Sequence, residues 1–104
     1  MSLSKPIPAE IKEKLSNDPF MKECCIASNE CEGRIEWHHN LIYGGKRQNE
    51  WWSILPVCHF HHMKESQYKS KLNDVMCNRA SYDELMPFCK AINYMAIKAE
   101  LDYA

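Results

Sequence analysis

Metal-binding side chains crowd into one stretch of this chain, residues 24–62. All five histidines lie within it, together with four of the six cysteines. Thiolates and imidazoles are the ligands that zinc and other transition metals take in proteins. A domain of 104 residues has a small hydrophobic core, so a bound metal that ties this stretch together would help to stabilise the fold.

Two pairs of these side chains have the spacing of a structural zinc site. Cys25 and Cys31 precede a short run of alternating polarity, and Cys58 and His61 follow it as a C-x-x-H pair. A turn between the pairs would close one tetrahedral site. Cys24 could replace Cys25, because the spacing does not distinguish the adjacent thiols. The competing interpretation is a set of buried free thiols, which the clustered histidines disfavour.

The hydrophobic pattern predicts a strand, a loop, a second strand and a helix around these ligands. We expect strands over residues 34–39 and 50–57, joined by a loop over 40–48 with a Gly-Gly tip. After Cys58 the apolar residues recur at intervals of three and four, which predicts a helix. The two halves of the zinc site would therefore lie at opposite ends of a β-hairpin.

Further helices are expected on either side of this core. Residues 8–17 predict a short helix, which Asp18-Pro19 would end. Residues 77–80 are expected to be a linker, and the S-x-x-E sequence over 81–84 predicts a capping box that opens a last helix over 81–102. The broad apolar surface of that helix would either cover the core or form a homodimer.

The ligand-rich stretch resembles the HNH nucleases of the ββα-metal, or His-Me finger, superfamily. The resemblance covers about residues 24–73 and rests on Trp37-His38-His39, Gly44-Gly45, Ile54-Leu55-Pro56-Val57-Cys58 and His61-His62. It implies a single α+β domain over residues 1–104, with a small ββα-metal core, zinc-binding loops, and flanking N-terminal and C-terminal helices. Many family members also carry cysteine pairs that bind a structural zinc.

This resemblance implies a metal-dependent endonuclease that hydrolyses DNA phosphodiester bonds. His39 matches the general base that takes a proton from water. His38 and His62 match the ligands of a catalytic divalent cation, such as Mg²⁺, Mn²⁺, Ni²⁺ or Zn²⁺. Glu65, one turn after His62, could add an oxygen through water, as could Glu36. Small HNH proteins of this kind are often found in phages and mobile elements.

The sequence departs from the family motif at one position. Five residues before Cys58, where the family often has an asparagine that braces the backbone around the base, this chain has Ser53. Asn49 lies four residues earlier. We expect either the Ser53 hydroxyl or the Asn49 amide to take this bracing role, so both are candidate catalytic residues beside His39.

The charge pattern permits contact with nucleic acid around the motif. The formal net charge is −1, but residues 34–71 hold six Lys or Arg against three acidic residues. This local excess would favour phosphate contact with modest, salt-sensitive affinity. The candidate contacts to double-stranded DNA are Arg34, Lys46, Arg47 and Lys64.

A second function also fits the sequence: a zinc-binding module of HNH fold that binds DNA or a protein partner without cutting. His39 and His62 distinguish the two, because only a nuclease needs both once the zinc ligands are satisfied. No apolar run approaches the ~18 residues of a membrane span, and the charged start does not resemble a signal peptide. Cysteines in a chain whose start does not resemble a secretory signal indicate metal binding in a reducing compartment. We therefore expect the cytoplasm of a bacterial or phage-infected cell.

Overall fold

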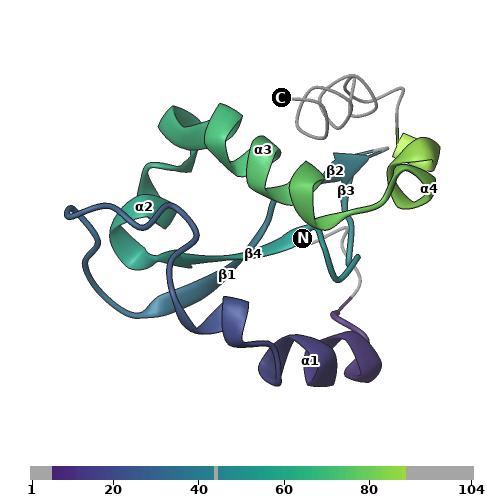
Figure 1. The fold of residues 1–104 in the computed structure, drawn as a ribbon, viewed down its shortest axis with the longest axis horizontal. Helices are drawn as coiled ribbons and strands as arrows, with labels where there is room; N and C mark the ends of the chain where they lie inside the picture. Colours follow the sequence, from purple (N-terminus) through teal and green to yellow (C-terminus); the bar gives the residue numbers. More distant parts are fainter. Residues whose placement is uncertain (1–5, 44, 89–104) are drawn as a thin grey trace.

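The computed structural model describes residues 6–43 and 45–88 of the chain. Within them the protein forms a small α+β fold with two antiparallel sheets of two strands each (Figure 1). This confirms the predicted α+β class. Gly44, Cys89 and most of the predicted last helix lie outside the described residues, as does the predicted dimer contact through that helix.

The main sheet pairs two strands that are separated in the sequence by a long connection. Strand β1 (Ile35–His39) runs antiparallel to β4 (Ile54–Cys58), with Ile35 opposite Cys58 and His39 opposite Ile54. The first strand is close to its predicted position. The second begins four residues later than predicted, because the chain over residues 51–53 forms a turn instead of a strand.

The connection between β1 and β4 contains a second hairpin. Strands β2 (Ile42–Tyr43) and β3 (Lys46–Arg47) pair antiparallel across its tip. The sequence predicted a plain loop here, and two-residue strands are too short to give a periodic signal. Trp52, which follows this hairpin, is buried in the core.

The N-terminal helix and the elements that follow it match the sequence pattern. Helix α1 (Ala9–Ser16) lies within the predicted range. Asp18 then accepts a hydrogen bond from the backbone of Phe20 and caps a short 3₁₀ helix, η1 (Pro19–Lys22). This turn brings the chain to the first cysteines of the zinc prediction.

The helical region after β4 is divided where one helix was expected. It consists of α2 (His59–Met63), the 3₁₀ helix η2 (Glu65–Tyr68) and α3 (Lys69–Arg79). Because α3 continues to Arg79, the predicted linker over 77–80 is wrong. The capping box is confirmed: the Ser81 hydroxyl accepts from the backbone of Glu84 at the start of α4 (Tyr82–Leu85), and η3 (Met86–Phe88) follows.

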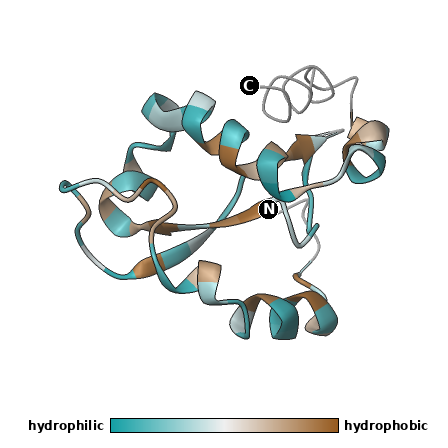
Figure 2. Ribbon diagram, viewed as in Figure 1, coloured by the Kyte–Doolittle hydropathy of each residue, from teal (hydrophilic) through white to brown (hydrophobic). Residues whose placement is uncertain are grey.

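The core lies on both sides of β4, between α1 and α3 (Figure 1). All five residues of β4 are buried, and Figure 2 shows this strand as apolar. Ile54 packs with Leu15 of α1, whereas Leu55 belongs to the cluster that includes Leu72 of α3. None of the helices in the described part of the chain is long and apolar enough to cross a membrane.

Candidate metal centres and catalytic residues

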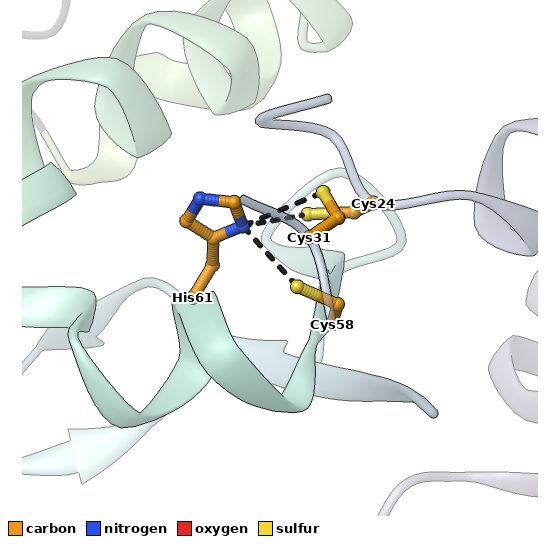
Figure 3. A group of neighbouring side chains, drawn as sticks. All are labelled: Cys24, Cys31, Cys58 and His61. Atoms are coloured by element: carbon orange, nitrogen blue, oxygen red, sulfur yellow. Dashed lines mark hydrogen bonds between the residues drawn. The ribbon is translucent and has the colours of Figure 1, made fainter. Parts of the chain in front are cut away.

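Three cysteines and one histidine converge at the start of α2. The Nδ1 atom of His61 lies 3.2 Å from the sulfur of Cys58 and 3.6 Å from the sulfurs of Cys24 and Cys31 (Figure 3). Zinc bonds of about 2.3 Å to sulfur and about 2.0 Å to nitrogen at tetrahedral angles would set these atoms roughly 3.5 Å apart. The group could therefore hold a metal ion such as zinc.

The local fold explains how the four side chains meet. Cys58 ends β4 and precedes the first residue of α2, so His61 follows it within the first turn of the helix. Cys24 and Cys31 come from the loop between η1 and β1. The hydroxyl of Ser28, in that loop, lies 3.1 Å from His61 Nε2. It can accept the Nε2 proton, which leaves the Nδ1 lone pair facing the sulfurs.

Cys24, and not the predicted Cys25, belongs to this group. The backbone N–H of Cys25 donates to Pro56 O at 2.9 Å, which ties the chain to β4. The sulfur of Cys24 lies 3.6 Å from His61 Nδ1, whereas the adjacent Cys25 packs against the apolar core. Burial raises the pKa of Cys25 to about 12, which keeps it a thiol.

The environment of Cys58 favours the form of cysteine that binds metals. Burial opposes its ionisation, but backbone hydrogen bonds at His61 and Glu32 and contacts with the His61 ring and Cys31 outweigh burial. Together they lower the pKa of Cys58 to about 6. Cys58 is therefore largely a thiolate at neutral pH, which is the ligand form.

A second group of possible metal ligands lies on the other side of α2. It consists of His38, His62 and Glu65, whose ligand atoms lie within 4.8 Å of one another. Glu65 Oε2 is 2.8 Å from His38 Nδ1 and 3.8 Å from His62 Nε2. The break after α2 places Glu65 in this position. His38 is 8% exposed, and burial lowers its pKa, although the Glu65 carboxylate opposes this shift.

Glu36 contacts His62 from the opposite side. Its carboxylate lies 2.9 Å from His62 Nδ1, 3.2 Å from His59 Nδ1 and 3.1 Å from Arg34 Nε. Hydrogen bonds from His62 and His59 lower the pKa of Glu36 to about 2. Among the described residues, Glu36 is thus a neighbour of the candidate ligand His62 and not a member of the group of possible metal ligands.

His39, the candidate base, contacts the Asn49 amide. His39 Nε2 lies 2.9 Å from Asn49 Oδ1. The Asn49 Nδ2 group donates to Pro6 O at 3.3 Å, which orients the amide oxygen toward the histidine. Of the two candidates for the bracing role, Asn49 is therefore the one that contacts His39.

Ser53 supports the loop that carries Asn49. Its side chain is fully buried, and its hydroxyl lies 3.1 Å from Gln48 O, 3.0 Å from Glu50 O and 3.2 Å from Glu50 N. These backbone atoms flank Asn49 on both sides. The hydroxyl thus braces the backbone around Asn49 and makes no direct contact with His39.

Ser53→Ala should weaken this support. Loss of the hydroxyl removes its hydrogen bonds to the half-buried backbone of Gln48 and Glu50, which costs about 1 kcal/mol of unfolding free energy. Urea denaturation of the wild type and the variant would measure the difference. Unchanged stability would show that the buried hydroxyl does not hold this turn.

A pocket of about 390 Å³ opens beside the second ligand group. Its lining includes His38, His39, His62 and Glu65, together with the cationic side chains of Arg47 and Lys69. The lining is completed by Trp37, Ile42 and Ser66. The pocket therefore joins the candidate base, the second ligand group and two positive charges.

The four residues predicted to contact phosphate do not lie together in the structure. Arg47 lines this pocket, whereas Lys46 lies on the exposed strand β3 and borders a neighbouring hollow. Arg34 pairs with Glu36, and the Lys64 ammonium lies 5.3 Å from the centre of the Phe60 ring. The pocket that holds the histidines is not lined by Lys46, Arg34 or Lys64.

Sequence reasoning missed Asn40, which is buried beside His38. For Lys69, as for Lys64 and Lys71, helical spacing left open either a phosphate contact or a solvated helix face, and the structure places Lys69 in the lining of the pocket. Alternation along β1 could have indicated Asn40, because residues two apart on a strand share a face. The turn between η2 and α3 that places Lys69 has no comparable signal in the sequence.

Comparisons with family models, with curated proteins and with solved structures found no match. The resemblance to HNH nucleases therefore remains an interpretation of the motif residues. Support for a function comes from the side-chain geometry of the two ligand groups and the pocket.

Proposed function

We propose that this protein is a metal-dependent endonuclease of the HNH type that hydrolyses DNA phosphodiester bonds. The observation that carries the proposal is the pocket in which His39 lies beside a second ligand group of His38, His62 and Glu65. This group is separate from the cysteine-rich one, so one metal would stabilise the fold and another would serve the reaction. Strand β1 carries His38 and His39, β4 pairs with β1, and α2 carries His62, an order of elements that supports a ββα-metal core.

The contacts of His39 suit a general base. An amide oxygen only accepts hydrogen bonds, so the contact with Asn49 Oδ1 requires the His39 proton to be on Nε2. Nδ1 then carries the lone pair that can take a proton from an attacking water. A neutral imidazole is a competent base at neutral pH.

The second group offers a fitting set of donors for a divalent cation. Two imidazole nitrogens and one carboxylate oxygen lie within 4.8 Å of one another, and ligands on a common ion at about 2.0–2.2 Å are separated by roughly 3 Å. When bound, such a cation stabilises negative charge on the phosphate and on the leaving oxygen. His38, His62 and Glu65 would hold it.

The rest of the pocket suits one segment of a nucleic-acid strand. Arg47 and Lys69 bring positive charge to a lining that also contains Trp37 and Ile42. Cationic side chains position phosphates, whereas apolar and aromatic ones contact sugars and bases. Cutting should therefore weaken as salt rises, because phosphate contacts release counterions.

His62→Ala tests the division between cation ligand and base. The variant should cut supercoiled plasmid DNA only at higher cation concentration, with the concentration for half-maximal rate raised at least roughly tenfold. His39→Ala is the matched control, because loss of a base is not repaired by added cation. Cutting rates measured over a series of Mn²⁺ concentrations give both responses.

Rescue of His62→Ala but not of His39→Ala would support the assigned roles. Equal rescue of both variants would contradict them. If the wild-type protein binds DNA and cuts none with Mg²⁺, Mn²⁺, Ni²⁺ or Zn²⁺, the non-catalytic zinc-binding module replaces the nuclease as the function.

A further inference from the structure

Three polar residues alternate along β1 and just beyond its end: Glu36, His38 and Asn40. Residues two apart on extended backbone share a face. Asn40 contacts the ligand His38, and Glu36 contacts the other ligand histidine, His62. One face of the strand thus carries the candidate ligand His38 together with Asn40, which contacts the His38 ring, and Glu36, which contacts the His62 ring.

Asn40 accepts the proton of one ring nitrogen of His38. Its side chain is 1% exposed, and its Oδ1 lies 3.2 Å from His38 Nε2. Its Nδ2 donates to Asn73 Oδ1 at 3.0 Å and faces Met76 Sδ at 3.5 Å. A thioether has no proton to donate, so the amide nitrogen must face Met76 and the oxygen must face His38. Asn40 Oδ1 therefore accepts a proton from His38 Nε2, and Nδ1 is the nitrogen that faces Glu65.

Glu36 imposes the opposite arrangement on His62. A carboxylate only accepts hydrogen bonds, so the 2.9 Å contact with His62 Nδ1 places the proton there. The lone pair of His62 is then on Nε2. Arg34 and His59 donate to the same carboxylate and hold it in place.

The other nitrogen of each ring faces one point. His38 Nδ1 lies 2.8 Å and His62 Nε2 lies 3.8 Å from the same oxygen of Glu65. A carboxylate only accepts hydrogen bonds, so the 2.8 Å contact requires a positive charge at this point, either a proton on His38 Nδ1 or a cation in its place. A cation there would take one lone pair from each ring.

We propose that Glu36 and Asn40 are positioning residues, which accept the N–H of His62 Nδ1 and of His38 Nε2 so that both rings can present their other nitrogen to one divalent cation. The inference rests on the cation site of the proposed function. It does not depend on whether the protein cuts DNA. Partners of this kind orient ligand rings and raise their basicity in metal sites.

The tautomers can be observed directly by ¹⁵N-detected correlation spectra of the histidine side chains. Zinc-loaded protein without other cations is measured at a pH above the ordinary histidine value of about 6.5. The expected result is a proton on Nδ1 of His62, which the Glu36 carboxylate accepts. Glu36→Ala should release His62 from the Nδ1–H form, whereas Glu36→Gln should retain it, because an amide oxygen still accepts the proton. His62 with its proton on Nε2 in the wild type would overturn the proposal.

Cation affinity gives a second readout that is independent of cutting. Mn²⁺ is the probe, since its low place in the affinity order leaves zinc bound to the thiolates, and its free concentration is measured by electron paramagnetic resonance. Glu36→Ala should weaken Mn²⁺ binding by about 10- to 100-fold, and Glu36→Gln by less. Asp74→Ala removes an exposed carboxylate from α3 and is the matched control, which should bind like the wild type.

The two readouts separate this inference from the proposed function. Mn²⁺ binding in the expected order by a protein that cuts no DNA would uphold the positioning roles and reject the nuclease. A protein that cuts DNA, with Glu36→Ala binding Mn²⁺ as tightly as the wild type, would reject the positioning roles alone. Absence of Mn²⁺ binding in the wild type would overturn the inference.

Discussion

His39→Ala is expected to lower the rate of DNA cutting by about 10²- to 10⁴-fold, the usual contribution of a general base. The side chain lies in the pocket with its Nε2 held by Asn49, so its removal takes away the proton acceptor and no cation ligand. Mn²⁺ affinity, zinc content and melting temperature should stay close to those of the wild type. Single-turnover cutting of supercoiled plasmid with saturating protein and cation measures the rate.

Asn49→Ala is the companion variant for this prediction. It leaves the base in place but removes the oxygen that fixes its tautomer, so its loss of rate should be smaller than that of His39→Ala. Undiminished cutting in His39→Ala would reject the assignment of the base. A larger loss in Asn49→Ala than in His39→Ala would show that the amide acts by another route.

Cys24→Ala is expected to remove zinc and unfold the protein, whereas Cys25→Ala should keep both. Only Cys24 faces His61, at 3.6 Å, while Cys25 packs against the core. Binding of a structural zinc contributes about 10–16 kcal/mol of apparent free energy in small domains. Loss of a partly buried thiol costs about 1 kcal/mol. Zinc content and thermal melting of the two purified variants measure these effects.

The adjacent positions make this pair of variants a matched comparison. Each loses one thiol at nearly the same place in the chain, so a difference between them reports on metal binding. Zinc loss in Cys25→Ala with retention in Cys24→Ala would reverse the assignment. Folded wild-type protein that is reduced and free of metal would reject the structural zinc.

The sequence predicted the parts of the structure that follow from periodicity and ligand spacing. Strand β1, the start of α1 and the capping box at Ser81 each depend on a few neighbouring residues. The C-x-x-H pair of Cys58 and His61 needs only one helical turn. Such local patterns can be read without knowledge of the tertiary fold.

The remaining features depend on contacts between distant residues. Cys24 and Cys25 differ in which side of the chain they occupy, and the hydrogen bond from Cys25 to Pro56 sets that side. Asn49 reaches His39 because Ser53 shapes the turn before β4. No spacing rule within the sequence encodes either arrangement.

The sequence pattern also did not predict the division of the helical region after β4 into α2, η2 and α3. Apolar residues continue at helical intervals through residue 64, where the chain changes from α2 to η2. The break brings Glu65 to within 2.8 Å of His38. The sequence indicated Glu65 as a donor through water, whereas the structure places its carboxylate in the ligand group itself.

The two metal sites are expected to have different roles, one in the fold and one in the reaction. Zinc-loaded protein, freed of loosely bound cations by a mild chelator, would be analysed for metal and then given plasmid DNA with increasing Mn²⁺. We expect one zinc per chain, no cutting before Mn²⁺ is added, and cutting that rises with Mn²⁺ to a plateau. Protein with one zinc per chain that leaves the plasmid intact at every Mn²⁺ concentration, or that cuts equally well without Mn²⁺, would contradict this division of roles.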